Sequence, residues 1–254
     1  MHITIEQHGA VQVLRWNRPE KRNAITASMY AQMAELLMAA SQDNGVRAVV
    51  LTGTEKAFSA GNDVEDFLLH PPLGADAPVL RFLAALSTFA KPLLAAVRGA
   101  AAGVGGTMLL HCDLVFASDD ARFSFPFTQL GLCPEAGSSL LLPRLVGHQR
   151  AAELLLLGEP FDAQEAHRMG MVNRVVASTE VESLALDHAQ KLALLPASAV
   201  VATKALLKGH AGDSVAARIE NEASQFGQLL QQPAAQEAFR AFAEKRAPRF
   251  LDID

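Results

Sequence analysis

Two glycine-rich segments and one isolated acid are the residues of this chain whose types and spacing could do chemistry. The first segment, residues 58–64, reads FSAGNDV, and the second, residues 99–107, reads GAAAGVGGT. The acid, Glu135, follows in the segment LCPEAGS. Two backbone N–H groups that converge on one carbonyl oxygen stabilise negative charge there, and a nearby carboxylate can take a proton from the adjacent carbon. The pattern therefore indicates a site that can hold and deprotonate a thioester.

Other uses of glycine-rich loops fit this sequence less well. A dinucleotide-binding fingerprint would need a third glycine where Met108 stands, and no Gly-Lys-Ser/Thr phosphate loop follows. Neither Ser59 nor Ser138 lies in the Gly-x-Ser-x-Gly pattern of a nucleophile elbow. The glycines of the second segment, taken alone, are explained equally well by close helix–strand packing. Because both loops stand between an apolar strand and a helical start, where amide donors are oriented, we favour the functional interpretation.

The composition narrows the class of protein. The 254 residues are 50% hydrophobic and 19% charged, which is enough for a sizeable core. The net charge of −5 argues against broad nucleic-acid binding, which needs a basic face. Cys112 and Cys133 lack metal-ligand spacing and predict buried thiols in a reducing compartment. No secretory signal is recognisable and no uncharged apolar stretch reaches the roughly 18 residues of a membrane span, so we expect a cytoplasmic protein that does not bind membranes.

Strands and helices alternate in the first half of the predicted secondary structure. A hairpin is expected over residues 3–6 and 11–16, and Thr26 can cap a helix whose apolar residues recur at helical spacing. Short apolar strands are expected over residues 48–52, 93–97 and 114–117. Each is followed by a turn or a glycine-rich loop and then a helical pattern. This order predicts βαβ-type units around a largely buried sheet.

From residue 149 onward the pattern is helical, apart from one apolar strand over residues 172–176. The expected helices are residues 149–157, 163–169, 179–195, 197–208, 215–230 and 233–245. We expect this helical tail either to pack on the core or to exchange with a neighbouring copy.

Six segments, which include the first glycine loop and part of the second, form a pattern when they are taken together. They are residues 18–24 (RPEKRNA), 58–64, 97–103 (VRGAAAG), 112–117 (CDLVFA), 130–134 (LGLCP) and 143–147 (PRLVG). The set resembles the enoyl-CoA hydratase/isomerase (crotonase) superfamily from about residue 11 to the closing FAEKR of residues 242–246. The resemblance implies an α/β fold, a crotonase-type spiral of ββα units with a helical C-terminal region. It also implies a core with the CoA-ester site over residues 1–195, a helical trimerisation region over residues 196–254, and a homotrimer or a hexamer of two trimers.

The same resemblance implies roles for individual residues. The backbone N–H groups of Asn62 and Val104 match the two donors of the family's oxyanion hole. The residues implied in binding CoA or substrate are Arg22, Ala24, Ser59, Ala60, Gly61, Asp63 and Lys245. An acyl pocket is implied at Phe67, Thr107 and Phe127. On pattern alone, Asp63 is expected to cap the helix that follows the first loop.

Two positions depart from the hydratases of this family, which use two glutamates to flank a water. This chain has Thr107 and Phe127 at the matching positions. Adding water across a double bond needs groups that orient the water and move its proton. A phenyl ring does neither, and a threonine hydroxyl is a poor base near neutral pH. We therefore do not expect efficient hydration.

Glu135 has two interpretations. On pattern alone, Pro134 and Glu135 begin a helical run, and acids favour helix starts. Residues 125–131 and 134–139, however, resemble Δ3,Δ2-enoyl-CoA isomerases of the peroxisomal type, in which the acid at this position is the catalytic base. A bacterial ring isomerase of phenylacetate breakdown similarly carries an acid there. The resemblance implies an acyl-CoA isomerase in which Glu135 moves a proton from C2 to C4 of a 3-enoyl-CoA.

The surroundings of Glu135 follow from the same interpretation. Phe125 and Phe127 are expected to line the pocket, desolvate the carboxylate and strengthen it as a base. No metal and no redox cofactor are expected, because coenzyme A enters as part of the substrate. His111, beside Cys112 and Asp113, suggests a metal ligand but is expected to be structural. The alternatives are a 2-enoyl-CoA hydratase, an isomerase of a ring acyl-CoA, and a non-catalytic acyl-CoA-binding protein.

Overall fold

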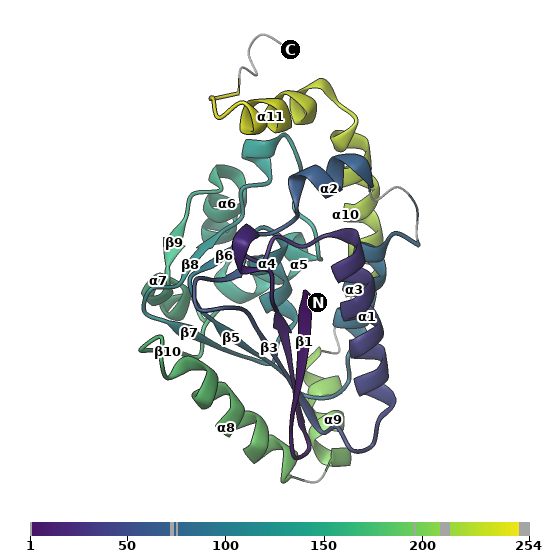
Figure 1. The fold of residues 1–254 in the computed structure, drawn as a ribbon, viewed down its shortest axis with the longest axis vertical. Coiled ribbons are helices and arrows are strands. Elements are labelled where there is room, and N and C mark those ends of the chain that lie inside the picture. The colour runs from purple at the N-terminus through teal and green to yellow at the C-terminus, as the bar shows by residue number, and fades with distance from the viewer. Residues whose placement is uncertain (1, 72–73, 75, 196, 209–213, 249–254) are drawn as a thin grey trace.

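The computed structural model describes residues 2–71, 74, 76–195, 197–208 and 214–248 (Figure 1). Its strands form two sheets. The first contains, in spatial order, β1 (Ile3–His8), β2 (Val11–Trp16), β3 (Ala48–Thr52), β5 (Leu93–Val97), β7 (Leu114–Ser118) and β10 (Arg174–Val176). The second contains β4 (Ala57–Ser59), β6 (Ala100–Ala102), β8 (Arg122–Ser124) and β9 (Phe161–Asp162).

The chain moves repeatedly from the first sheet to the second. β3 is followed by β4, β5 by β6 and β7 by β8, and neighbouring strands of these sets pair in parallel. β1 and β2 form the predicted antiparallel hairpin, and β9 pairs antiparallel with β8 at the edge of the second sheet. The predicted spiral of ββα units is confirmed.

The central strands of the first sheet are buried because helices cover both faces. Every residue of β3 and β5 is buried, which matches their unbroken apolar sequences AVVLT and LLAAV. Successive residues of a strand point to opposite faces. Val49 lies in the main core with α1 (Ala27–Gln42) and α3 (Pro78–Thr88), whereas Val50 packs with α8 (Val181–Ala193). Figure 1 shows α8 on the opposite side of this sheet from α1 and α3.

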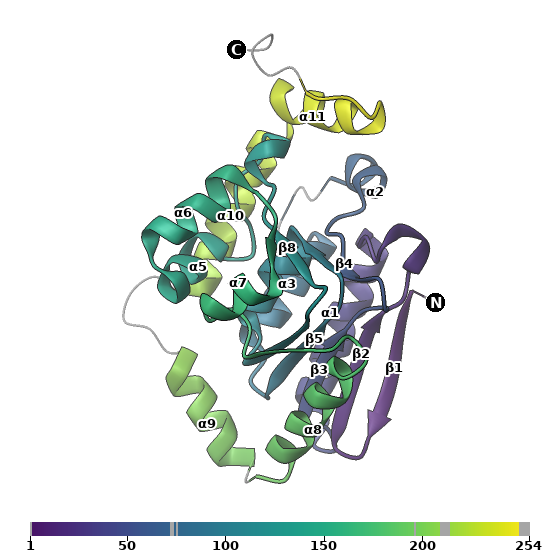
Figure 2. The ribbon, with the colours of Figure 1, turned by 90° about the vertical axis from the view of Figure 1, so that its left-hand side faces the viewer.

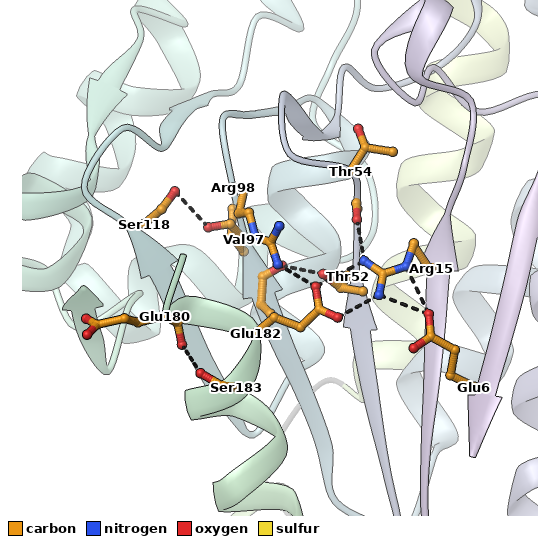
Figure 3. A network of polar contacts seen from close by, with 12 residues as sticks. Glu6, Arg15, Thr52, Thr54, Val97, Arg98, Ser118, Glu180, Glu182 and Ser183 are labelled. Atoms are coloured by element: carbon orange, nitrogen blue, oxygen red, sulfur yellow. Dashed lines mark hydrogen bonds and ion pairs between the residues drawn. The ribbon is translucent and has the colours of Figure 1, made fainter. Parts of the chain in front are cut away.

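A network of ion pairs ties α8 to the first sheet (Figure 3). Glu182, in the first turn of α8, accepts hydrogen bonds from Arg15 of β2 at 2.6 Å and from Arg98, which follows β5, at 2.5 Å. Arg15 also pairs with Glu6 of β1 at 3.0 Å. The hydrogen bond from Arg15 is the main reason that the pKa of Glu182 is lowered, and the charges of both arginines add to it.

The remaining helices follow the alternating and then helical order that the sequence predicts. They are η1 (Pro19–Lys21), α2 (Val64–Leu69), α4 (Val104–Thr107), η2 (Met108–His111), η3 (Thr128–Leu130), α5 (Ser138–Val146), α6 (His148–Leu157), α7 (Ala163–Arg168), α9 (Ala197–Lys208), α10 (Val215–Leu230) and α11 (Pro233–Ala243). Figures 1 and 2 place α11 at one end of the molecule and α8 and α9 at the other.

The C-terminal helices pack on the core of their own chain. Ile219, Phe226 and Leu230 of α10 belong to the main hydrophobic core. Lys204 of α9 reaches Asp113, with 2.6 Å between its Nζ and Oδ2. Among the described helices, no single one is both long and apolar enough to cross a bilayer, and only α8 and α9 counted together across a 111° bend have that length and composition.

Several predicted boundaries differ from the structure, most by one or two residues, and two differences have a clear physical cause. The strand predicted from residue 172 begins at Arg174, because the N–H of Val172 donates back to the carbonyl of Ala166 in α7 and not to β7. Asn173 makes the first contact with β7: its N–H donates to the carbonyl of Val115, and its side-chain oxygen accepts the N–H of Val115, both at 2.7 Å. The helix predicted to begin at Pro134 and Glu135 begins only at Ser138. The two residues in between have φ of +58° and +69°, which a right-handed helix does not contain.

Candidate active site

The two glycine-rich segments meet at the ends of neighbouring strands. β4 and β6 pair in parallel, so the loops that follow them lie side by side. Gly61 and Gly103 both have positive φ, +92° and +53°. A Cβ on Gly61 would lie 2.9 Å from the carbonyl oxygen of Ala102, and the Cβ position of Gly103 is 4.0 Å from the Cα of Gly61. Only glycines allow this conformation and this close an approach.

The two predicted oxyanion donors, the N–H groups of Asn62 and Val104, directly follow the two glycines that are in contact. The N–H of Asp63 donates to the carbonyl of Ile25 at 2.9 Å, and that of Gly103 donates to the carbonyl of Ser124 at 3.0 Å. The N–H groups of Asn62 and Val104 donate to no acceptor in the part of the chain that the structure describes. Val104 is the first residue of α4, where a helix leaves its N–H groups without internal partners. Both amides can therefore bind an outside oxygen.

Glu135 lies in a turn before α5 and is only 7% exposed. Thr107 donates its hydroxyl proton to Oε1 of Glu135 across 2.8 Å. The carbonyl of Glu135 accepts hydrogen bonds from the N–H and the hydroxyl of Ser138, at 3.0 and 2.6 Å. Thr107, predicted in the acyl pocket, thus lies buried behind Glu135 and orients its carboxylate. The interpretation of Glu135 as an acid of the first helical turn is wrong, because the helix begins three residues later.

A narrow hollow of about 30 Å³ connects Glu135 with the first loop, since Asn62 and Glu135 both line it. The other described residues that line it are Phe67, Val79, Leu80, Leu83, Ala136, Ile219, Ala223 and Phe226. Apolar side chains of α2, α3 and α10 therefore surround the carboxylate. Phe125, predicted to desolvate Glu135, instead packs in the core 5.7 Å from the ring of Phe161, because Gly106 and β9 leave space for it there.

A larger cavity of about 650 Å³ opens beside this hollow and shares Asn62, Phe67 and Phe226 with it. Its volume is in the range of small-molecule sites. Of the residues predicted to bind CoA or the acyl group, those that line it are Arg22, Ala24, Ala60, Gly61, Asp63, Phe67 and Phe127. Lys21 adds a second cation, and Phe226, Phe239 and Phe242 of the C-terminal helices complete the wall.

Two predicted CoA-binding residues do not line this cavity. Ser59 is fully buried, donates its hydroxyl to the carbonyl of Asn23 at 2.9 Å and accepts the N–H of Gly61 at 3.1 Å. It shapes the first loop from behind. Lys245 follows α11, where its N–H donates to the carbonyl of Phe242 and its side chain is exposed. Within the described ranges, no three His, Cys, Asp or Glu residues gather as a metal site.

Comparison with known proteins assigns the chain to a family. The pattern of the family described as Enoyl-CoA hydratase/isomerase matches residues 6–252. The chain belongs to this family. It is 36% identical over 253 residues to a protein named probable enoyl-CoA hydratase of Rhodobacter capsulatus, which covers 98% of this chain and 97% of the relative. It is 35% identical over 226 residues to enoyl-CoA delta isomerase 2 of Rattus norvegicus, covering 87% of this chain and 58% of the relative.

A solved structure supports the fold of this family member. The enoyl-CoA hydratase/isomerase from Pseudoalteromonas atlantica T6c superposes with a TM-score of 0.93 at 41% identity, over 98% of this chain and 100% of the other. The activity of the family is on CoA thioesters. The relatives' names include both hydratases and isomerases, so these names do not decide which reaction this enzyme catalyses. The residues of its own site have to decide it.

Asp63 fixes the first loop at its helical end, as the sequence predicts. Its Oδ1 accepts the N–H of Asp66 at 3.1 Å and so caps α2. Its Oδ2 accepts a hydrogen bond from Arg18 at 2.6 Å, and Arg18 also donates to the carbonyl of Ala24 at 3.0 Å. Burial pushes the pKa of Asp63 upward, but the N–H of Asp66 and the Arg18 guanidinium outweigh burial, so the pKa is lowered overall.

Tyr30 is a neighbour of the site that the sequence did not reveal. Its hydroxyl donates to Oδ1 of Asn62 at 2.5 Å. Burial, followed by the negative charges of Glu135 and Asp66, raises the pKa of Tyr30 well above its usual value, so the phenol stays a neutral donor. In the sequence, Tyr30 falls beside Met29 and near Met33 in the buried face of α1, where it looks like an ordinary core residue.

Proposed function

We propose that this enzyme moves the double bond of a 3-enoyl-CoA into conjugation and releases 2-trans-enoyl-CoA. The observation that carries the proposal is the hollow at Glu135. Among the described residues that line it, Glu135 provides the one carboxylate and the remaining walls are apolar apart from Asn62. A reaction that needs one acid–base group and no bound water suits such a site.

The proposal assigns the two ends of the substrate to the two cavities. The CoA portion would occupy the larger cavity, with Lys21 and Arg22 near its phosphates. The thioester oxygen would accept the N–H groups of Asn62 and Val104. Each such donor, aimed at the oxygen that becomes negative, contributes about 2.7–4 kcal/mol to stabilising the transition state. The acyl chain would then pass Asn62 and Phe67, which line both cavities.

The chemistry conserves every atom of the substrate. Glu135 takes a proton from C2, the electron pair of that C–H bond forms a C1–C2 double bond, and the carbonyl π pair moves onto the thioester oxygen to give a dienolate. The oxygen pair then re-forms the carbonyl, the C1–C2 π pair becomes the C2–C3 double bond, and the C3–C4 π pair takes the proton from the protonated Glu135 at C4. Positioned acid–base transfer of this kind contributes about 10²–10⁴-fold. The reaction requires no further cofactor.

Hydration of a 2-enoyl-CoA is the competing reaction, because relatives include proteins named hydratases. Hydration needs a second group that holds or activates water. The hydroxyl of Thr107 is already donated to Glu135 at 2.8 Å. The phenyl ring of Phe127 offers no polar atom. The engaged hydroxyl of Thr107 and the apolar ring of Phe127 both favour isomerisation over hydration.

Purified protein should be given 3-hexenoyl-CoA and, separately, 2-hexenoyl-CoA while the absorbance of the conjugated thioester is followed. The proposal predicts a rise with the 3-enoyl ester and no change with the 2-enoyl ester. A fall with the 2-enoyl ester identifies a hydratase. No change with either, while hexanoyl-CoA still binds, identifies an acyl-CoA-binding protein.

The role of Glu135 is tested by Glu135→Gln, which keeps the shape of the side chain and removes the base. We expect kcat to fall by about 10²–10⁴-fold while the Kd for hexanoyl-CoA stays within a factor of about two. The matched control is Glu153→Gln, whose side chain is 57% exposed on α6. Equal activity of the wild type and Glu135→Gln would overturn the assignment of the base.

We also propose that the protein forms a trimer or a hexamer. Leu206 and Leu207 on α9 are 81% and 75% exposed in the single chain, and a neighbouring copy would cover them. Light scattering coupled to size exclusion should give a mass of three or six chains. A monomeric mass would contradict this proposal.

A further inference from the structure

One short helical stretch contacts both the carboxylate and the backbone of the Glu135 turn. Val104 begins α4, Thr107 ends it, and His111 ends η2, the 3₁₀ helix that follows directly. Thr107 donates to Oε1 of Glu135 at 2.8 Å. The Nε2 of His111 lies 2.7 Å from the carbonyl oxygen of Ala136. The stretch that begins with an oxyanion donor therefore also holds the carboxylate of the proposed base and the carbonyl of the residue that follows it.

The turn that His111 contacts needs such support. Ala136 has φ +58° and Gly137 has φ +69°, so two successive residues are in the left-handed region. This conformation is strained for a residue with a Cβ and persists only where its surroundings fix it. Ser138 fixes the carbonyl of Glu135, at 2.6 Å from its hydroxyl. His111 fixes the next carbonyl, that of Ala136. The carbonyls of Glu135 and Ala136, on either side of the φ and ψ angles of Ala136, are therefore both hydrogen-bonded.

The buried imidazole is suited to be a permanent donor. His111 is 3% exposed, and desolvation lowers its pKa to about 4, with Lys208 and Lys204 adding to the effect and the Ala136 carbonyl opposing it. The ring is therefore neutral at physiological pH and carries one N–H. Because a carbonyl oxygen can only accept, that proton must be on Nε2. The neighbouring Lys208 donates to the carbonyl of His111, at 2.8 Å, and does not compete for the ring.

We infer that His111 is a positioning residue for the proton transfer: its Nε2–H, donated to the Ala136 carbonyl, holds the left-handed turn that aims Glu135 at the two glycine loops. His111 does not line the hollow or the larger cavity, so it acts through Ala136 and not on the substrate. The inference rests on the proposed function, because it takes Glu135 as the base.

The test compares His111→Gln with His111→Leu. A glutamine Nε2 reaches about as far as the histidine Nε2 and can donate to the same carbonyl, whereas leucine fills the space without a donor. With 3-hexenoyl-CoA we expect His111→Leu to lower kcat by about 10- to 100-fold with KM and the Kd for hexanoyl-CoA unchanged. His111→Gln should restore kcat to within about threefold of the wild type.

His167→Leu is the matched control, because the Nδ1 of His167 lies 2.8 Å from the carbonyl of Val172, away from the site. It should lose a similar hydrogen bond without lowering kcat. Wild-type kcat in His111→Leu, or an equal loss in His111→Gln and His111→Leu, overturns the inference. If Glu135→Gln is as active as the wild type, the proposed base fails instead, so the two failures are distinguishable.

A second measurement does not depend on turnover or on the folding of a variant. Long-range proton–nitrogen NMR of the wild type should show the His111 imidazole as the neutral Nε2–H form throughout pH 5–8. A neutral Nδ1–H form, or protonation with an ordinary midpoint near pH 6.5, would overturn the inference.

Discussion

Asp63 joins the first glycine loop to α2, and its replacement by asparagine separates its two roles. Asparagine caps a helix about as well as aspartate, so Asp63→Asn keeps the bond to the N–H of Asp66 and loses the negative charge beside Arg18. The pair is 2.6 Å long and its side chains are 15% and 6% exposed. Removing one member of a buried pair costs about 3–5 kcal/mol.

We expect Asp63→Asn to lower the free energy of unfolding by about 3 kcal/mol, the low end of that range, because Arg18 keeps its bond to the carbonyl of Ala24. Asp63→Ala also removes the cap and should cost about 1 kcal/mol more. The control is Glu65→Gln on the same helix, whose ion pair with Lys21 is 3.6 Å long and exposed. It should have no measurable effect.

The effect of Asp63→Asn should depend on pH. The pKa of Asp63 is lower in the folded protein than its ordinary value of about 3.9. A lowered pKa gives stability that is fully present above the unfolded value and is lost as the pH falls through the folded value. The difference between wild type and variant should therefore be constant from about pH 5 to 8 and shrink below about pH 4.

Urea unfolding at fixed protein concentration, repeated at pH 7, 4 and 3, measures this difference. A difference below about 0.5 kcal/mol at pH 7, or one of equal size at pH 7 and 3, would refute the reasoning. We also expect Asp63→Asn to reduce kcat on 3-hexenoyl-CoA, because the neighbouring N–H of Asn62 is held by this loop.

Three further predictions concern the hydrogen bonds of Thr107 and Tyr30 around the site and the ion pairs of Glu182 with Arg15 and Arg98. Thr107→Val should lower kcat by about 10- to 150-fold, since a hydrogen bond to a charged group contributes about 1.5–3 kcal/mol. Thr107→Ser keeps the hydroxyl and should keep kcat within about threefold of the wild type. Equal losses in both variants would argue against the bond to Glu135. Tyr30 is the chain's one tyrosine, so an alkaline titration of phenolate absorbance should show no ionisation near the ordinary value of about 10; a normal titration would mean that its hydroxyl is not bound to Asn62 in a buried site. Glu182→Gln should lower the free energy of unfolding by about 1 kcal/mol and leave kcat unchanged. This loss of stability should disappear at acid pH, because the pKa of Glu182 is lowered in the folded protein. A loss of activity would show that the ion-pair network of Glu182 also serves the site.

The sequence predicted what depends on local pattern. The apolar runs of β3 and β5 were predicted with the correct bounds, because strands buried on both faces are continuous hydrophobic stretches. The glycine loops were predicted as neighbours of one another, and the structure brings Gly61 and Gly103 into contact. Asp63 was predicted as a cap, and it caps α2.

The surroundings of Glu135 could not be predicted in the same way. Its apolar walls come partly from Ile219 and Phe226 of α10, which lie more than eighty residues further along the chain. Amphipathic periodicity shows that such a helix has a buried face but not which element that face covers. Phe125 is expected in the pocket because residues two apart in an extended segment point to the same side. The chain turns here instead: Phe127 has helical φ and ψ of −60° and −51°, and its N–H donates to the carbonyl of Phe125 at 2.9 Å. The helix start at Pro134 was wrong because Ala136 gives no sign in the sequence of its left-handed conformation.

The central claim is that one buried carboxyl moves a proton from C2 to C4, and the fate of an isotope tests it directly. 3-Hexenoyl-CoA with deuterium at both C2 positions should be converted in ordinary water, and the product analysed for deuterium at C4. Because Glu135 is only 7% exposed, the proton it holds is shielded from solvent, and we predict 2-trans-hexenoyl-CoA with substantial deuterium at C4. A product with only protium at C4, or a 3-hydroxyacyl-CoA product, would contradict the claim.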